Sequence, residues 1–186
     1  GIEVFATGGL GGVHRGAAES FDISADLGVL GRTPVLVVCA GVKSILDVPA
    51  PLEYLESLSV PVIGYRTDAF PGFYLADSGH DVPHRVDAPE EVAAVMAARE
   101  AIGATAALLV ANPLPSSRQV DPALHDRVLA DGLTAAAAAG VHGKDVTPFL
   151  LAHFHEASGG ESLRANTEII LANAALAGRI ATAASA

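Results

Sequence analysis

Residues 21–47 read FDISADLGVLGRTPVLVVCAGVKSILD, and the apolar run in the middle of this stretch decides the fold. The run VLVVCA, at 35–40, is typical of a strand that is buried on both faces of a parallel sheet. Two carboxylates, Asp22 and Asp26, precede this run, and Lys43 follows it in a Gly-Val-Lys-Ser turn. The chain has only one other lysine, so the position of Lys43 just after the end of a buried strand indicates a specific role rather than general surface charge.

Apolar runs and helical segments alternate outward from this strand. Other strands are expected at 2–7, 60–65 and 105–111. Helices with proline, acidic or glycine boundary signals are expected at 22–30, 49–58, 89–102, 122–139, 146–157 and 162–184. Residues 67–83 are expected to form a loop-rich insertion. This alternation predicts an α/β fold, a three-layer α/β/α arrangement with a mostly parallel sheet, in a single domain that covers residues 1–186.

Composition narrows the class of protein. Apolar residues make up 51% of the chain and charged residues 17%, which suits a mostly buried α/β domain. The formal net charge of -10 argues against nucleic acid and anionic membranes as partners. No apolar run reaches the ~18 residues of a membrane span, and the lone Cys39 excludes an internal disulfide. We therefore expect a cytoplasmic protein that acts on a small molecule.

Several strand exits carry polar groups. The glycine-rich loop 8–16 carries His14, the turn 41–44 carries Lys43, and the loop 112–115 begins with Asn112. Because ligands of open α/β sheets gather at the carboxyl ends of strands, we expect these side chains to converge on one rim. The glycine loop matches neither common phosphate motif, so a tight turn explains it as well as an anion site does.

Two interpretations stay open for each charged group of residues 21–47. Lys43 is either the partner of a nearby carboxylate or a nucleophilic amine that forms a Schiff base with a carbonyl. Asp22 and Asp26 are four residues apart and would share a face if the segment were helical. Either Asp22 caps the helix while Asp26 faces solvent, or a carboxylate holds a hard cation such as Mg²⁺ or Mn²⁺.

Six segments together resemble the pseudouridine-5′-phosphate glycosidase family (pseudouridylate synthase, or indigoidine synthase A-like). They are FATGGLGGVHRGA, FDISADL, VVCAGVKSILD, VPVIGYRTDAFPGFY, LVANPLP and HGKDVTPFLL. The resemblance extends over essentially the whole chain. It implies a cytoplasmic, manganese-dependent, homotrimeric α/β/α enzyme that reversibly cleaves pseudouridine 5′-phosphate to uracil and ribose 5-phosphate.

The resemblance also assigns roles to residues in these motifs. It makes Lys43 the catalytic nucleophile and Asp22 the ligand of Mn²⁺ or another divalent cation. The residues that it implies at the substrate are Ser24, Ala25, Asp26, His14 and Asn112.

The chemistry of this reaction accounts for a lysine nucleophile. A C–C glycosidic bond offers no heteroatom leaving group to protonate, so the two-carboxylate scheme of ordinary glycosidases fits poorly. An amine that attacks C1′ as the sugar ring opens holds the ribose covalently and provides an iminium as an electron sink. Protonation of uracil C5 by a general acid then lets the C–C bond break, and water hydrolyses the imine.

The chain opens inside an apparent strand and without an initiator Met, which indicates a piece of a longer protein. In the family that the sequence resembles, an earlier part of the chain supplies a catalytic Glu and a substrate-binding Lys. We therefore expect an N-terminally truncated glycosidase domain that alone turns over little substrate. The alternatives are an inactive relative that serves as a sugar-phosphate-binding protein or subunit, and a different activity on the same scaffold, as in the pigment-biosynthesis relatives.

Overall fold

The computed structural model describes residues 1–44 and 46–185, and within this part of the chain five strands form one sheet. The strands are β1 (Val4–Ala6), β2 (Leu36–Cys39), β3 (Val62–Tyr65), β4 (His84–Val86) and β5 (Leu108–Ala111). Their order is β1-β2-β5-β3-β4, and every neighbouring pair is parallel. The expected parallel sheet is confirmed, with β2 and β5 near its centre.

The helices begin and end close to the expected positions. They are α1 (Ala17–Ser20), α2 (Ala25–Leu30), α3 (Pro49–Ser57), α4 (Pro89–Ala101), α5 (Pro122–Ala138), the short 3-10 helix η1 (Gly143–Asp145), α6 (Val146–Ala157) and α7 (Glu161–Ala184). Three of them start with proline, whose fixed φ and missing N–H suit the first helical turn. Gly31 follows α2 directly and bonds to its last turn, as its sequence position predicts.

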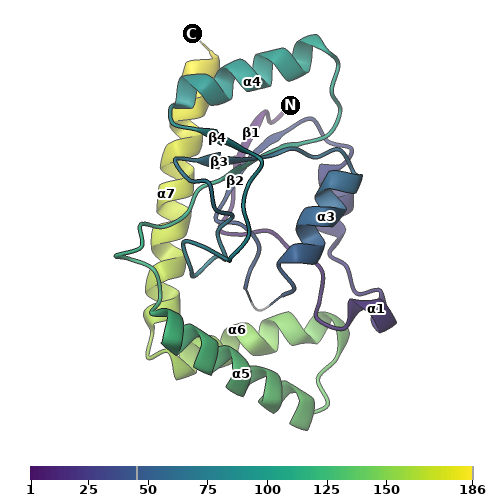
Figure 1. Ribbon diagram of the computed structural model, residues 1–186, viewed down its shortest axis with the longest axis vertical. Helices are drawn as coiled ribbons and strands as arrows, with labels where there is room; N and C mark the ends of the chain where they lie inside the picture. The colour runs from purple at the N-terminus through teal and green to yellow at the C-terminus, as the bar shows by residue number, and fades with distance from the viewer. Residues whose placement is uncertain (45, 186) are drawn as a thin grey trace.

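Helices cover both faces of the sheet, which confirms the three-layer α/β/α arrangement. Successive residues of β2 and β5 alternate between two hydrophobic clusters. One cluster joins the sheet to Val92 of α4 and to Leu176 and Ile180 of α7. The other joins it to Leu27 of α2 and Leu55 of α3. Figure 1 shows α7 along one side of the molecule and α3 on the opposite side.

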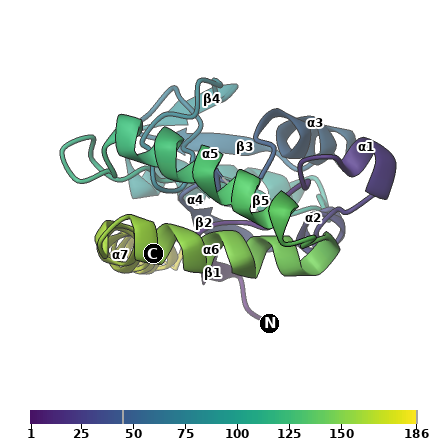
Figure 2. The ribbon, with the colours of Figure 1, turned by 90° about the horizontal axis from the view of Figure 1, so that it is seen from below.

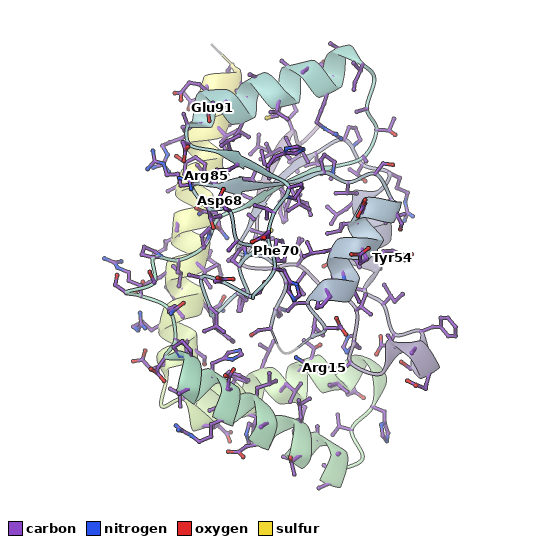
Figure 3. All side chains as sticks on the ribbon, in the orientation of Figure 1. Arg15, Tyr54, Asp68, Phe70, Arg85 and Glu91 are labelled. Atoms are coloured by element: carbon purple, nitrogen blue, oxygen red, sulfur yellow. The ribbon has the colours of Figure 1, made fainter. Side chains whose placement is uncertain are left out.

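Helices α5 and α6 form a pair of their own. They run across one end of the molecule, away from α4 (Figure 1), and Figure 2 shows them next to each other in the view from below. The insertion 67–83 contains no helix or strand of the sheet, as expected, but it is packed rather than loose. Its Phe70 is fully buried near the middle of the molecule (Figure 3), and its Tyr74 stacks on Phe154 of α6 at 5.5 Å between ring centroids.

Two elements lie outside the sequence expectations. No strand was expected at 84–86, but these residues form β4, an edge strand whose residues are exposed or half-buried. The four-residue helix α1 follows Gly16, and none of its residues is buried. Both elements are short and lack the apolar periodicity that reveals a buried strand or an amphipathic helix. Among the described residues, no helix is both long and apolar enough to cross a lipid bilayer.

Candidate active site at the strand ends

Three of the polar strand exits lie at one edge of the sheet. Strand β2 is flanked by β1 and β5, and the pairing continues beyond the strands. The N–H of Leu10 donates to the carbonyl of Gly41 at 2.9 Å, and the N–H of Asn112 donates to the carbonyl of Cys39 at 2.8 Å. The glycine loop, the Lys43 turn and the loop after β5 are therefore neighbours. That His14, Lys43 and Asn112 line a common pocket stays a prediction.

Close packing explains most glycines of the loop 8–16. A Cβ at Gly9 would lie 2.6 Å from the ring of Phe73, and a Cβ at Gly11 would overlap the hydroxyl of Ser24. Only Gly16 in this loop has a positive φ, of 82°. The N–H of Gly11 donates to the carboxylate of Asp26 at 2.9 Å, so a carboxylate of the protein occupies one of the anion-binding positions that such a loop offers.

Residues 22–26 pack against the glycine loop. The N–H of His14 donates to the carbonyl of Asp22, and the N–H of Ser24 donates to the carbonyl of Gly12. Ser24 is the N-cap of α2, because its hydroxyl accepts the N–H of Asp26 at 3.3 Å. Asp22 lies before the helix begins, so it shares no helical face with Asp26, and the interpretation that Asp22 caps the helix is wrong. Asp26 is exposed, as one interpretation held, and Ala25 is the exposed first residue of α2.

Asp22 and His14 form the group that best suits a cation. His14 Nδ1 lies 3.8 Å from Asp22 Oδ2, and both side chains are partly exposed. Among the described residues there is no cluster of three or more His, Cys, Asp or Glu side chains that could hold a metal. Two protein groups are too few for zinc, which is usually enclosed by three or four protein ligands, whereas the carboxylate of Asp22 suits a hard cation that keeps several waters, such as Mn²⁺ or Mg²⁺. The metal-ligand role of Asp22 remains a prediction.

The turn that carries Lys43 is tightly packed on both sides. Lys43 is half-buried, and Val42 before it and Ser44 after it are buried. The proposed ion pair between Lys43 and Asp22, Asp26 or Asp47 is wrong, because no ion pair of Lys43 occurs among residues 1–44 and 46–185. Asp47 instead accepts the N–H of Ala50 at the start of α3, at 3.1 Å. The amine of Lys43 is therefore not neutralised by these carboxylates.

Asn112 belongs to a hydrogen-bonded network that ties the sheet to α7. Its side-chain amide donates to Asn173 Oδ1 at 2.9 Å, and Asn173 Nδ2 donates to the carbonyl of Thr7 at 2.7 Å. Asn173 is completely buried in α7. Sequence reasoning missed Asn173, although its place in the repeating core positions of α7 marks it as a polar residue on a buried face.

A second buried contact joins the Lys43 turn to α5. Ser44 Oγ lies 2.6 Å from His125 Nε2, and His125 Nδ1 lies 3.0 Å from Asp126 Oδ1. Sequence reasoning passed over His125 entirely. The signal that could have found it is its spacing, since His125 shares the buried face of α5 with Val128, Gly132 and Ala136.

Burial raises the pKa of two groups near the Lys43 turn, a thiol and a phenol. Desolvation raises the pKa of the Cys39 thiol, at the end of β2, to about 12. Desolvation also raises the pKa of the Tyr74 phenol to about 12, although a hydrogen bond with the side chain of Ser162 acts in the opposite direction. Both groups are protonated at neutral pH, so neither is an activated nucleophile.

The arrangement has clear relatives among known proteins. The family model described as indigoidine synthase A like protein matches residues 1–183. A pseudouridine-5′-phosphate glycosidase of Salinispora tropica is 64% identical over 187 residues, which cover 100% of this chain and 58% of that protein. A protein of the same name from Saccharopolyspora erythraea is 58% identical, over 98% of this chain and 60% of that protein.

Two solved structures share the fold. The prealnumycin C-glycosynthase AlnA, in complex with ribulose 5-phosphate, superposes with a TM-score of 0.92 at 35% identity, over 99% of this chain and 61% of that one. An indigoidine synthase A-like protein of Thermotoga maritima gives a TM-score of 0.85 at 38% identity, over 97% of this chain and 59% of that one. The chain thus spans about three-fifths of the length of these relatives. The resemblance seen in the motifs is confirmed, and the chain belongs to the indigoidine synthase A-like family.

Proposed function

We propose that the protein takes part in the reversible cleavage of pseudouridine 5′-phosphate to uracil and ribose 5-phosphate, with Lys43 as the nucleophile. The observation that carries this proposal is the state of Lys43. It follows a central strand, it is half-buried, and it has no ion pair among the described residues. The choice of pseudouridine 5′-phosphate as the substrate is supported by the 64% identity to a protein named pseudouridine-5′-phosphate glycosidase.

The proposed reaction has three steps. The neutral amine of Lys43 attacks C1′ of the ribose, and the C1′–O4′ bond breaks as O4′ takes up a proton. Next, the nitrogen lone pair forms a C1′=N bond while the C1′–C5 bond breaks, and its electron pair on uracil C5 takes up a proton from a general acid. Water then hydrolyses the iminium, which returns the amine of Lys43 and releases ribose 5-phosphate.

The other residues of the site would bind and orient the substrate. Asp22 and His14 would hold Mn²⁺ or another divalent cation, which when bound supplies a fixed positive charge for anionic or hydroxyl groups. Ser24, Ala25 and Asp26 sit next to the glycine loop and would contact the substrate there. Asn112 would contribute from the neighbouring strand exit while its amide group keeps its bond to Asn173.

Uracil release from pseudouridine 5′-phosphate in the presence of Mn²⁺ tests the activity, with the Salinispora relative as positive control. We expect the 186-residue chain alone to turn over little, because it spans only about three-fifths of the length of the relatives that carry this name. Borohydride trapping with ribose 5-phosphate tests the nucleophile separately, and the added mass should map to Lys43. An adduct of equal yield in Lys43→Ala would reject this role, and Lys43→Arg serves as the charge-matched control.

A second candidate is C-glycoside synthesis on another acceptor. AlnA is named a C-glycosynthase and was solved with ribulose 5-phosphate, so the likeness favours a pentose 5-phosphate as the shared ligand. Offering ribose 5-phosphate with uracil, and separately with an aromatic acceptor, distinguishes the two. An inactive sugar-phosphate-binding role would give ribose 5-phosphate binding without borohydride-trapped adduct. The homotrimer implied by the resemblance stays a prediction, which sedimentation velocity tests.

A further inference from the structure

The contact between Ser44 and His125 brings together residues 81 positions apart in the sequence. Ser44 is 7% exposed and His125 is 3% exposed, whereas the carboxylate side chain of Asp126 is 78% exposed. The ring of His125 also packs at a tilt against Phe154 of α6, with ring centroids 5.4 Å apart. A histidine in this setting has a fixed ring plane, a buried partner at Nε2 and a solvated carboxylate at Nδ1.

The two contacts of the imidazole determine its tautomer. An ionised carboxylate only accepts hydrogen bonds, so next to the carboxylate of Asp126 the Nδ1 of a neutral ring carries the proton and donates to it. Nε2 is then an acceptor, and the hydroxyl of Ser44 donates to it. The direction of donation in these hydrogen bonds, from Ser44 to His125 and from His125 to Asp126, follows from the negative charge of the exposed Asp126.

Ser44 is the residue directly after Lys43, so the hydrogen bonds that link Ser44, His125 and Asp126 restrain the turn. The carbonyl of Ser44 accepts a hydrogen bond from Nη2 of Arg15 at 3.4 Å (Arg15 is labelled in Figure 3). On the other side of Lys43, Val42 pairs with Leu10 and Gly41 pairs with Gly72. The backbone of Lys43 is thus held before it by two β-bridges and after it by His125 and Arg15.

We propose that His125 is a positioning residue, held by Asp126 in its Nδ1–H tautomer, that fixes Ser44 and through it the backbone of the Lys43 turn. The Ser–His–Asp order resembles a hydrolase triad, but Ser44 is buried beneath the turn and is poorly placed to attack a substrate. The restraint instead makes Lys43 preorganised for attack, because a displacement of about 1 Å at a reacting group can cost about 100-fold in rate. This effect on rate rests on the proposed function, whereas the tautomer does not.

Nitrogen-15 NMR of the imidazole ring tests the tautomer without any substrate. We expect the Nδ1 of His125 to show the shift of a protonated nitrogen and Nε2 that of an unprotonated one. In Asp126→Asn, where the charge is lost, the Nε2–H form should gain population. The control is Asp131→Asn, which removes the same charge from an exposed site on the same helix and should leave the His125 signals unchanged. A wild-type ring in the Nε2–H form would overturn the proposal.

The amine of Lys43 gives a second readout that also needs no substrate. Reductive methylation with carbon-13 formaldehyde labels the two lysines and the N-terminus, so the Lys43 signal can be assigned with Lys43→Arg. We expect His125→Leu and Ser44→Ala to broaden or shift this signal. His125→Gln, which keeps a hydrogen-bonding group for Ser44, should restore it. An unchanged signal in folded His125→Leu or Ser44→Ala would contradict the restraint.

Kinetics then measure the consequence for catalysis. In protein that shows uracil release, we expect kcat to fall about 10- to 100-fold in His125→Leu, with KM changed less, and His125→Gln to recover most of the loss. His155→Gln, at an exposed histidine of α6, is the matched control and should keep full activity. Should His125→Leu fail to fold, Asp126→Asn takes its place in the kinetic test, because an exposed side chain can be replaced without disrupting the core. A wild-type kcat in Asp126→Asn together with a changed tautomer of His125 would overturn the link to Lys43. Absence of a borohydride-trapped adduct at Lys43 in the wild type would refute the proposed function and leave the two spectroscopic tests to judge the restraint.

Discussion

The Lys43 turn and the Asp22 segment lie at the same edge of the sheet, but they are held in different ways. In the turn, Gly41, Val42 and Ser44 are buried, and side chains and backbone from three other segments press on them. In the segment from Asp22 to Asp26, the residues are half-buried or exposed and are held mainly by backbone hydrogen bonds to the glycine loop. The proposed nucleophile is therefore fixed by packing, while the proposed ligands of cation and substrate keep room to adjust.

Gly41, in the Lys43 turn, is the position where a single added methyl group should destabilise the protein most. Its φ is 78°, and a Cβ there would overlap the carbonyl oxygen of Pro71. We expect Gly41→Ala to lower the free energy of unfolding by more than about 4 kcal/mol, since left-handed strain and backbone overlap act together. The matched control is Gly28→Ala in α2, which meets only the end of the Arg32 side chain and should stabilise by about 0.5–1 kcal/mol. Urea denaturation measures both, and equal effects would show that the two regions do not differ.

Alkaline pH should weaken the buried region selectively. Because burial raises the pKa of Cys39 from 9.0 to about 12, the folded protein keeps the thiol proton while the unfolded chain loses it. This stability is fully present below pH 9 and is lost as the pH rises towards 12, by about 1.4 kcal/mol for each pH unit and about 4 kcal/mol in total. The slope of unfolding free energy against pH should be shallower in Cys39→Ala. A slope that is identical in the two proteins would contradict the burial of the thiol.

The network beneath Asn112 should have an intermediate effect. Asn173→Ala removes the partner of the Asn112 amide and of the Thr7 carbonyl, both near the core. We expect a loss of about 2–3 kcal/mol, because buried polar groups without partners are costly. Thr182→Ala, which removes an exposed hydroxyl bond within the same helix, should cost less than about 0.5 kcal/mol. Thermal unfolding of both variants measures the difference, which would vanish if solvent reached the Asn173 site.

The smallest change in stability is expected in the Asp22 segment. Ser24→Ala deletes the cap of α2 and should cost about 1 kcal/mol. Because Ser24 also belongs to the proposed substrate site, the same variant should weaken ribose 5-phosphate binding measured by calorimetry. Ser57→Ala, which removes an exposed serine hydroxyl at the end of α3, is the control and should leave binding unchanged. Unaltered binding in Ser24→Ala would place the substrate elsewhere.

Sequence alone predicted most of the fold, because its strands are apolar runs and its helices have clear boundary residues. The buried strands β2, β3 and β5 follow from hydrophobicity, whereas the edge strand β4, with His84 and Arg85, carries no such signal. A capping residue before α2 was likewise predictable from local chemistry, but the structure gives this role to Ser24 rather than Asp22. Local patterns describe contacts between residues that are close in sequence, and these elements depend mainly on such contacts.

The candidate site was less predictable because it depends on distant pairs. The contact of Ser44 with His125 spans 81 positions, and that of Thr7 with Asn173 spans 166. The ion pair considered for Lys43 was inferred from proximity in sequence, yet Asp47 accepts the N–H of Ala50 and Asp26 accepts that of Gly11 instead. A carboxylate near a lysine in the chain has several possible partners, and only the fold decides among them.

The order of the strands has a consequence for how the chain folds. Strands β1 and β2 form one half of the sheet and β3 and β4 the other, and in the described part of the chain β5, the last strand in the sequence, pairs with both β2 and β3. During synthesis the backbone groups of β2 and β3 that pair with β5 therefore have no strand partner until residues 108–111 have been made. Unpaired strand edges of this kind slow folding and make the partly folded chain prone to aggregation. Pulsed hydrogen exchange should accordingly show the amides of β2, β3 and β5 becoming protected in one late, common step.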